Sequence, residues 1–364
     1  MKAKPIWVMG MMSGTSLDGV DAALLKTDGT EILEFGETAY RSYSKKERAV
    51  LRNGLGAWQG APTVEPVSEL VELAHVETAQ KLPGAELLGF HGQTLAHDPR
   101  NGKTHQAGDG RVLSEALGCP VVWDFRSTDV EMGGEGAPLA PVFHFAAVKW
   151  AKISAPVAIL NLGGVGNLTI IDPSYDKPEE PGALLAFDTG PANALINDLM
   201  VRETGKPFDK NGDLARSGKI QRKVLKRFRK DSYFARIPPK SLDRDTFAWL
   251  DDAVKGYPVA SAAATLTEVS ALALLMALEH CPVRPKKLYV TGGGRNNSFM
   301  MERISALTSI PATPIEDIGL DGDMLEAQAF AYLAARVYFG LPTSFPSTTG
   351  VATAIGGGQI SRPS

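Results

Sequence analysis

Three glycine-rich turns place backbone amides where an anion could bind. They are Gly14–Asp21 (GTSLDGVD), Asn161–Asn167 (NLGGVGN) and Gly292–Gly294. Glycine allows a close backbone approach and positive φ angles, and successive N–H groups in a turn form an anion-binding nest. Each turn alone could be an ordinary β-turn, and the first lacks the GxxxxGK[ST] pattern of a P-loop. Because three occur in one chain, we predict that they form a nucleotide-binding site.

Carboxylates in the first turn suggest a metal beside that nucleotide. Asp18 and Asp21 could hold Mg²⁺ directly or through water, since Mg²⁺ prefers oxygen ligands and keeps part of its hydration shell. The spacing does not decide between these two residues and Asp188, which lies in the second half of the chain.

Two further carboxylates are candidates for chemistry. Asp188 follows the apolar stretch LLAF and precedes a Thr-Gly-Pro turn, so it could act as a general base. Its alternative is a helix N-cap, a position that Asp favours. Glu326 stands at the start of an alanine-rich helical stretch, where it could either line a site or face solvent.

Polar side chains also follow two other short apolar stretches. His91, Gln93 and Thr94 lie in the sequence HGQT and offer groups that suit sugar hydroxyls. Arg126, in DFR, carries a guanidinium fork that suits a carboxylate or a phosphate. The alternative for Arg126 is an ion pair with one of the nearby acids Asp124, Asp129 and Glu131.

The elements that must position these residues form a repeated pattern. A hairpin of strands Ile6–Met12 and Val20–Lys26 encloses the first turn, and a hairpin of Val157–Leu162 and Leu168–Ile171 encloses the second. Two halves that open alike suggest a duplicated α/β architecture with a cleft, although a single doubly wound sheet stays open. Further strands are expected at Thr30–Tyr43, Leu87–Phe90, Pro120–Trp123, Leu184–Phe187 and Lys287–Val290, and helices at Lys45–Leu55, Pro66–Lys81, Gly110–Leu117, Lys219–Lys230, Val259–Leu278, Asn296–Leu307 and Asp323–Val337.

Composition narrows the class of protein. The 364 residues suggest about two domains. A net charge of −3 gives no strong positive field for nucleic acid or an anionic membrane surface. We therefore expect a protein that binds a small molecule, with neither nucleic acid nor membrane as a partner. The two widely separated cysteines, Cys119 and Cys281, are typical of the reducing cytoplasm, where we expect the protein to be located.

Taken together, the motifs resemble the anhydro-N-acetylmuramic acid kinase family along nearly the whole chain. In order they are MSGTSLDGVD, FHGQTLAHDP, VVWDFRSTD, GGEGAPLAP, NLGGVGNLT, FDTGPAN, TGGGRNN and GDMLEAQAFAYLA. The resemblance implies a two-domain actin-like ATPase fold of the α/β class, ribonuclease H-like, with ATP in the interdomain cleft. It implies an N-terminal domain of residues 1–125 plus 338–364 and a C-terminal domain of residues 126–337.

The resemblance also implies a reaction in cell-wall (peptidoglycan) recycling. With ATP and Mg²⁺, the family opens the 1,6-anhydro bridge of 1,6-anhydro-N-acetylmuramic acid with water and phosphorylates O6, giving N-acetylmuramic acid 6-phosphate. Asp188 corresponds to the general base, and Arg126 is placed to bind the lactyl carboxylate. The other implied substrate contacts are His91, Gln93, Thr94 and Glu326, and the implied ATP contacts are Gly14, Thr15, Ser16, Leu17, Asp18, Gly19, Val20, Asp21, Asn161, Gly163, Gly164, Gly292, Gly293 and Gly294.

The sequence departs from the family pattern near the expected sugar site. Glu135 stands where a Gln is expected, and Glu131 and Met132 stand where small residues are more usual. Other hypotheses remain: an ordinary hexose or amino-sugar kinase of the same fold, or a nucleotide-gated interaction protein. A homodimer is compatible with the resemblance.

Overall fold

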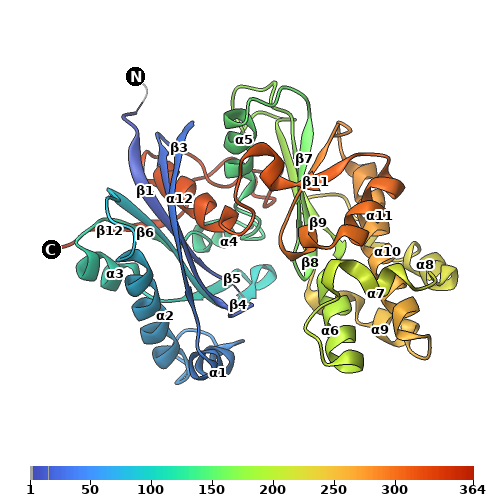
Figure 1. The fold of residues 1–364 in the computed structure, drawn as a ribbon. Coiled ribbons are helices and arrows are strands. Elements are labelled where there is room, and N and C mark those ends of the chain that lie inside the picture. Colours follow the sequence, from blue (N-terminus) through green and yellow to red (C-terminus); the bar gives the residue numbers. More distant parts are fainter. Residues whose placement is uncertain (1–2, 15) are drawn as a thin grey trace. The chain divides into compact units, whose positions relative to one another are not determined.

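The structure, a computed structural model, describes residues 3–14 and 16–364 apart from the side chain of Arg244. Thr15, one of the expected ATP contacts, therefore lies outside the described residues. The chain forms two compact units, Met1–Lys152 with Met324–Ser364, and Ile153–Asp323 (Figure 1). The domain boundaries expected from the sequence, after residues 125 and 337, fall inside the first of these units.

The first unit is built on a mixed sheet with the strand order β12-β6-β4-β1-β2-β3, with β5 also paired to β4. Strands β1, β4 and β6 are parallel, whereas β2 is antiparallel to both of its neighbours. The strands are β1 Ile6–Ser13, β2 Gly19–Thr27, β3 Ile32–Ser42, β4 Leu87–Asp98, β5 Lys103–Ala107, β6 Val121–Trp123 and β12 Gln359–Ser361.

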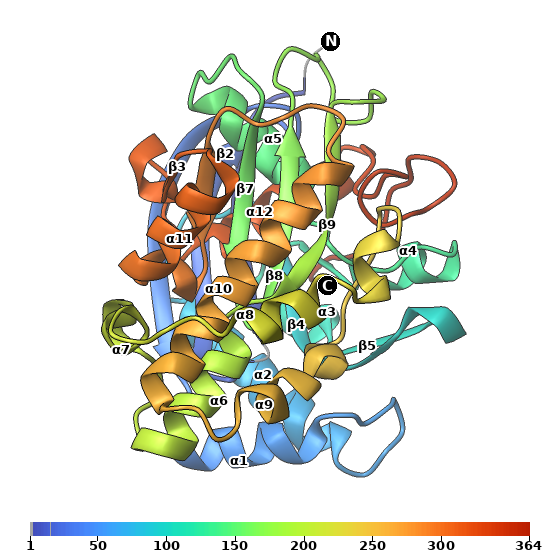
Figure 2. The same ribbon diagram turned by 90° about the vertical axis from the view of Figure 1, so that its right-hand side faces the viewer.

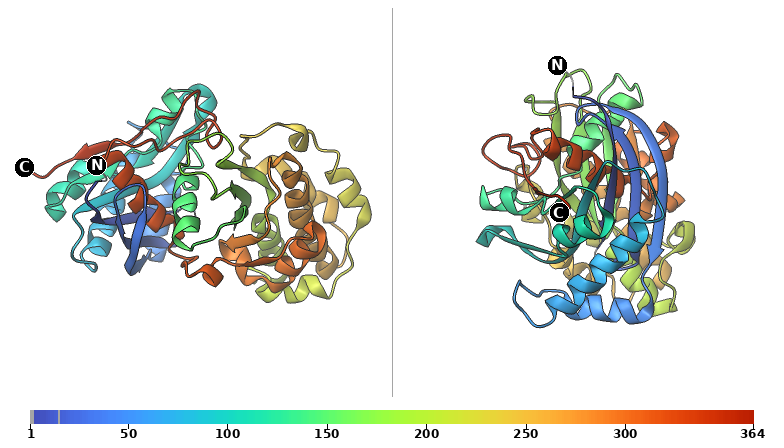
Figure 3. Two further views of the ribbon diagram at one scale, coloured as in Figure 1. Left: turned by 90° about the horizontal axis from the view of Figure 1, so that it is seen from above. Right: turned by 90° about the vertical axis from the view of Figure 1, so that its left-hand side faces the viewer.

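Successive side chains of β1 point to opposite faces of this sheet, and the two faces pack against different helices. Met9 and Met11 join the core beneath helix α2, and Gly10 points toward helix α12. A Cβ at Gly10 would lie 1.9 Å from the carbonyl oxygen of Ala327, so only glycine lets α12 pack this closely. Figure 3 shows α12 beside these strands. The helices of this unit are α1 Lys45–Gly54, α2 Val64–Ala79, α3 Gly110–Leu117, α4 Ser127–Glu131, α5 Pro141–Trp150 and α12 Leu325–Tyr338.

The second unit repeats the topology of the first. Its strand order is β11-β10-β7-β8-β9, with β7, β10 and β11 parallel and β8 antiparallel to both neighbours. Position by position across the sheet, these strands correspond to β6, β4, β1, β2 and β3 of the first unit, with the same directions. The duplicated α/β architecture expected from the two hairpins is therefore confirmed. The strands are β7 Val157–Leu162, β8 Val165–Ile171, β9 Leu184–Pro191, β10 Leu288–Thr291 and β11 Ala312–Pro314.

A buried helix, α10, organises the core of the second unit. It packs on the sheet and on α6 and α11, as Figure 2 shows. The segment Val259–His280 is long and apolar enough to cross a membrane, but 78% of its apolar window is buried inside the protein, as expected of a core helix. The helices are α6 Asn193–Thr204, α7 Asp213–Arg216, α8 Arg222–Phe228, α9 Trp249–Val254, α10 Val259–Ala277 and α11 Ser298–Thr308.

Several expected element ends were wrong in a way that matters for the site. Strand β4 does not stop at Phe90 but runs to Asp98, so HGQT lies within a strand rather than in a loop after it. Likewise β9 runs through Asp188 to Pro191. Strand β5 and helix α5 were not anticipated. In both extended strands, ladder hydrogen bonds from neighbouring strands continue the pairing across polar and glycine residues.

Two glycines of the C-terminal tail, Gly357 and Gly358, have a packing function. A Cβ on Gly357 would lie 3.2 Å from the carbonyl oxygen of Phe125, and Gly358 has φ +91. The next residue, Gln359, donates to Oδ2 of Asp124 at 2.9 Å and begins the strand that pairs with β6. The tail is therefore an edge strand that lies against the backbone just before Arg126.

Candidate functional site

The first glycine turn is shaped by its own aspartate. Oδ1 of Asp18 accepts the hydroxyl of Ser16 at 2.7 Å and the N–H of Gly19 at 3.1 Å. The N–H of Leu17 donates to the carbonyl of Gly14 at 3.1 Å, and Leu17 has φ +57. Leu17 is buried while Ser16 and Asp18 are exposed, so the turn holds its polar groups toward solvent.

Two buried side chains support the start of this turn. Gln93 on β4 is fully buried; its Oε1 accepts the Ser13 hydroxyl at 2.6 Å and its Nε2 donates to the Gly14 carbonyl at 3.3 Å. The hydroxyl of Tyr43 lies 3.1 Å from Ser13, and burial raises the pKa of Tyr43 to about 12, so it stays a neutral phenol. The structure thus places Gln93 behind the turn, away from solvent, rather than where a sugar could reach it.

Gly14 and Gly19 serve different ends. A Cβ at Gly14 would meet only the Ser16 hydroxyl, at 3.6 Å, so its backbone is open to a ligand. A Cβ at Gly19 would lie 2.4 Å from the Arg41 carbonyl and 2.5 Å from the Tyr40 ring. Glycine at position 19 is therefore required by the packing of β2 on β3, whether or not a phosphate binds there.

Arg126 is anchored by a histidine and a carbonyl. Its Nε donates to Nε2 of His91 at 3.0 Å, and its Nη1 donates to the carbonyl of Gly136 at 2.6 Å. Neither partner is one of the nearby acids Asp124, Asp129 and Glu131. Burial lowers the pKa of Arg126, and the charges of Glu326 and then Asp129 act in the opposite direction. Gly136 is held in turn by its N–H, which donates to the buried Asp129 at 2.6 Å.

His91 is a neutral buried acceptor. Its Nδ1 lies 2.8 Å from the Gly92 carbonyl, so Nδ1 carries the proton and Nε2 is free to accept from Arg126. Burial, and then the charge of Arg126, lower the pKa of His91 well below its ordinary value. The ring packs on Phe330, with centroids 4.5 Å apart. His91 thus orients the guanidinium of Arg126 and has little solvent exposure of its own.

Glu326 opens helix α12 on the same side of the first unit. Desolvation raises the pKa of its carboxyl, the charge of Arg126 lowers that pKa, and the charge of Asp18 raises it. The side chain is nevertheless in contact with solvent. These three charges therefore lie close enough to influence one another. Thr94 is half-buried, and its hydroxyl accepts from Gln106 Nε2 at 3.3 Å.

In the second unit, the other two glycine turns lie against each other. A Cβ at Gly292, which has φ +72, would fall 2.3 Å from Oδ1 of Asn161, and one at Gly294 would fall 2.5 Å from Cβ of Leu162. The N–H of Asn193, at the start of α6, donates to the carbonyl of Gly163 at 2.9 Å. These close approaches explain the glycines at 292 and 294, and they leave Gly164 and Gly293 exposed.

Asp188 has the most defined environment of the candidate residues. Its Oδ1 accepts from Nδ2 of Asn167 at 2.9 Å, and its Oδ2 accepts from the N–H of Leu242 at 2.8 Å. Helix α6 begins at Asn193 with Ala192 as its N-cap, so Asp188 is not the cap that the sequence allowed. A half-buried carboxylate with a hydrogen-bond donor at each of its oxygens is held in a fixed orientation, as a general base requires.

Residues 233–242 form the support of Asp188, and sequence reasoning missed them. The hydroxyl of Tyr233 donates to the Asp188 carbonyl at 2.5 Å, and the Asp188 N–H donates to the carbonyl of Lys240 at 3.0 Å. Lys240 is buried, and desolvation lowers its pKa to about 8. Its Nζ donates to the Tyr233 carbonyl at 3.2 Å. The signal in the sequence that could have pointed to this segment is Pro238-Pro239-Lys240, which stands in a polar stretch.

These features define a class: a duplicated α/β protein with glycine-rich turns in each unit and an aspartate held in a fixed orientation, which is the organisation of an ATP-dependent phosphotransferase. The family model for anhydro-N-acetylmuramic acid kinase matches residues 6–362. The anhydro-N-acetylmuramic acid kinase of Cereibacter sphaeroides is 58% identical over 100% of this chain and 98% of its own length, and that of Roseobacter denitrificans is 56% identical over 100% and 96%. The chain belongs to the anhydro-N-acetylmuramic acid kinase family and is a kinase that uses ATP to phosphorylate an anhydro amino sugar in peptidoglycan recycling.

The solved structures that match the chain are much more distant. A ROK family glucokinase from Streptomyces griseus, in complex with glucose and AMPPNP, matches with 14% identity and a TM-score of 0.44 over 91% of this chain and 99% of that one. A dehydratase activator from Clostridium difficile with bound ADPNP matches with 11% identity and a TM-score of 0.42 over 91% and 94%.

Proposed function

We propose that Asp188 is the general base of a hydrolytic phosphorylation of 1,6-anhydro-N-acetylmuramic acid. The observation that carries this assignment is the pair of donors, Asn167 Nδ2 and Leu242 N–H, that fix the two carboxylate oxygens of Asp188. A carboxylate oriented in this way can take a proton without first reorganising its own hydrogen bonds.

The proposed reaction begins with proton transfer from water and ends with the release of ADP. Asp188 accepts a proton from water, and the resulting hydroxyl bonds to C1 of the sugar. The bond between C1 and O6 breaks, and its electron pair stays on O6. O6 then bonds to the γ-phosphorus of ATP, and ADP leaves, which gives N-acetylmuramic acid 6-phosphate. The fixed side chains act mainly by positioning and by electrostatics, as is general for phosphoryl transfer.

We further propose that the exposed turn of the first unit binds ATP phosphates, with Gly14, Ser16 and the backbone around Asp18 as contacts. The residues that would hold Mg²⁺ are Asp18 and Asp21. Oδ2 of Asp18 accepts no hydrogen bond from any residue that the structure describes, so it fits a hard cation. Bound there, Mg²⁺ would neutralise phosphate charge. Within the described residues no cluster of three or more His, Cys, Asp or Glu side chains forms a metal cage, which agrees with a cation held largely by phosphates and water.

In the second unit, we propose that Asn161, Gly163 and Gly164 bind phosphate and that the Gly292–Gly294 turn binds adenosine. Gly293 has no atom within 4 Å of where a Cβ would stand, so its backbone is open to a flat ligand. Arg295 supports this turn: its Nη1 donates to the Gly292 carbonyl at 3.1 Å, and its Nε pairs with Glu316 at 2.8 Å.

For the sugar, we propose that Arg126 binds the lactyl carboxylate and that His91 acts through Arg126 as a positioning residue. With Nε and Nη1 already engaged, Nη2 of Arg126 is available to pair with a carboxylate. Glu326 and Thr94 are proposed as sugar contacts. Gln93, being fully buried behind the first turn, is proposed to position that turn instead. We place the enzyme in the cytoplasm, where ATP is available.

The test is an assay of ADP release with Mg-ATP and a panel of sugars. We expect ADP and a 6-phosphate product with 1,6-anhydro-N-acetylmuramic acid. Incorporation of ¹⁸O from labelled water at C1 would support attack by water. Turnover of plain hexoses without preference for the lactyl ether would instead indicate an ordinary sugar kinase, and ATPase activity that no sugar stimulates would overturn the proposal.

A further inference from the structure

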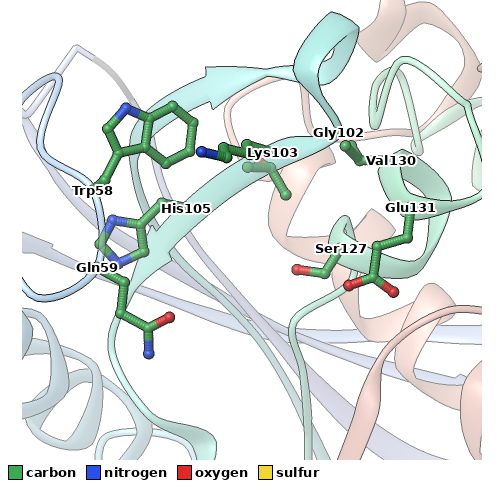
Figure 4. A pocket seen from close by; sticks show the side chains of 9 residues that line it. Trp58, Gln59, Gly102, Lys103, His105, Ser127, Val130 and Glu131 are labelled. Atoms are coloured by element: carbon green, nitrogen blue, oxygen red, sulfur yellow. The ribbon is translucent and has the colours of Figure 1, made fainter.

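A separate pocket lies in the first unit, beside the residues assigned to the sugar. It has a volume of about 360 Å³ and is lined by Trp58, Gln59, Gly102, Lys103, Thr104, His105, Ser127, Val130 and Glu131 (Figure 4). None of these residues takes part in the proposed chemistry. Ser127 directly follows Arg126 in the chain, so the pocket adjoins the proposed lactyl site.

One wall of the pocket is an indole held in place by the backbone around it. Trp58 sits in the loop between α1 and α2 and is 38% exposed, which is unusual for so large an apolar ring. Nδ1 of His105 lies 2.9 Å from the carbonyl of Ala57, and the N–H of Gly56 donates to the carbonyl of Leu95 at 2.8 Å. These bonds fix the loop before any ligand arrives, so binding would cost little ordering of the loop.

The other walls carry polar side chains, several of which have hydrogen-bonding capacity left over among the residues that the structure describes. The side chains of Gln59, Lys103 and Glu131 make no hydrogen bond to any residue that the structure describes, and the ring of His105 uses Nδ1 only, which leaves its Nε2 open. In Figure 4 the carboxylate of Glu131 faces the pocket from the side opposite Trp58. Lys103 places its Nζ 6.0 Å from the centre of the Trp58 ring. The pocket therefore offers one apolar face and several separate donors and acceptors.

The charges decide which ligand fits. The carboxylate of Glu131 would repel an anionic ligand, and the ammonium of Lys103 would repel a cationic ligand. A neutral ring with several hydroxyl groups can donate to Glu131 and accept from Lys103 while its C–H face lies on the indole. The volume of about 360 Å³ lies at the lower end of the roughly 300–1,000 Å³ that small-molecule sites occupy, which suits a ligand the size of one pyranose.

We propose that this pocket is an accessory site for a neutral pyranose, stacked on Trp58, next to the sugar that is phosphorylated. The proposal deepens the proposed function, on which it rests for the identity of the neighbouring sugar: it extends the substrate class to a muramic acid derivative that carries or accompanies a second, uncharged sugar unit. Occupancy of the pocket itself does not require catalysis.

The experiment titrates N-acetylglucosamine into the full-length protein by calorimetry, with and without saturating 1,6-anhydro-N-acetylmuramic acid, in the Asp188→Asn variant so that no turnover occurs. We expect saturable binding that survives the anhydro sugar. Trp58→Ala should weaken it at least tenfold, and Trp58→Phe no more than about threefold. Tyr338→Ala, which removes an aromatic ring of similar exposure (42%) elsewhere in the same unit, should leave it unchanged.

Charged analogues complete the design. Galacturonic acid and glucosamine should both bind more weakly than N-acetylglucosamine, and Glu131→Gln should remove the discrimination against galacturonic acid. Absence of saturable N-acetylglucosamine binding, equal binding by Trp58→Ala, or tighter binding of either charged sugar would overturn the proposal. Turnover of the anhydro sugar is measured in parallel. Failure of wild-type turnover alone would count against the proposed function, whereas Trp58→Ala should turn over the anhydro sugar normally.

Discussion

Replacing Asp188 by Asn tests the proposed base while leaving its shape unchanged. The carboxylate accepts from two donors, Asn167 Nδ2 at 2.9 Å and the Leu242 N–H at 2.8 Å. An Asn side chain has one carbonyl oxygen and one NH₂ group, so in either orientation one of these donors faces another donor. A half-buried donor left without an acceptor costs about 1–3 kcal/mol of stability.

The catalytic loss should be larger than this loss of stability. Removing a general base typically lowers the rate by about 10²–10⁴, which corresponds to roughly 3–5 kcal/mol of transition-state free energy. We therefore expect kcat for ADP release with the anhydro sugar to fall at least a hundredfold. The thermal unfolding midpoint should fall modestly, and the Kd of ATP should change less than about threefold.

A double variant separates the two effects. In Asn167→Asp with Asp188→Asn, the new Asn can donate its NH₂ group to the carboxylate at position 167 and accept the Leu242 N–H with its oxygen. The pairing is restored, but the carboxylate has moved from β9 to β8. We expect the unfolding midpoint to recover and kcat to stay low.

Three results would refute the reasoning. Retention of more than a tenth of wild-type kcat in Asp188→Asn would remove the base assignment. Recovery of kcat in the double variant would show that the position of the carboxylate is unimportant. Loss of ATP binding in a fully folded Asp188→Asn protein would point to a role at the metal or the phosphates.

The remaining predictions concern binding, packing and pH. Arg126→Ala should raise KM for the anhydro sugar roughly 10- to 100-fold with a smaller change in kcat, as expected for a lost charged hydrogen bond of about 1.5–3 kcal/mol. The control Arg111→Ala, which removes an exposed ion pair, should change neither KM nor kcat. Equal effects of the two substitutions would refute the role of Arg126. Gly10→Ala would bring a Cβ within 1.9 Å of the α12 backbone and should sharply lower the unfolding midpoint. The control Gly293→Ala should not, because no atom lies within 4 Å of the added Cβ. An unchanged midpoint in Gly10→Ala would contradict the close packing of α12 on β1. Lys240 has a pKa lowered from 10.5 to about 8, so below pH 8 the folded state bears the full penalty of a buried ammonium, and this penalty fades as pH rises through 10.5. Lys240→Met should therefore gain stability relative to wild type below pH 8 and lose that advantage toward pH 10.5, as followed by unfolding at several pH values; a gain that does not depend on pH would refute it.

Local sequence patterns were sufficient for much of the fold. Apolar strands flanking glycine turns predicted both hairpins, and the spacing of apolar residues predicted α3 and α10 to within a residue. The failures came where tertiary pairing overrides local signals. Strand β4 continues through His-Gly-Gln-Thr because β5 pairs with its far end, and the polar residues of β4 gave no sign of that partner.

The amino-acid sequence alone reveals which groups are available: three glycine turns, an aspartate after an apolar strand, an arginine after another, and an order of motifs that indicates the family. These are properties of neighbouring residues, so one chain is enough to show them. The surroundings of each group, and so what it can do, depend on how the chain folds. The tertiary structure buried Gln93 behind the first turn, gave Arg126 a neutral histidine as a partner, and set Gly292 against Asn161. It also held Asp188 by the N–H of Leu242, 54 positions away. A backbone donor is common to every residue except proline, so no pattern of side chains could have revealed that contact before the chain was folded.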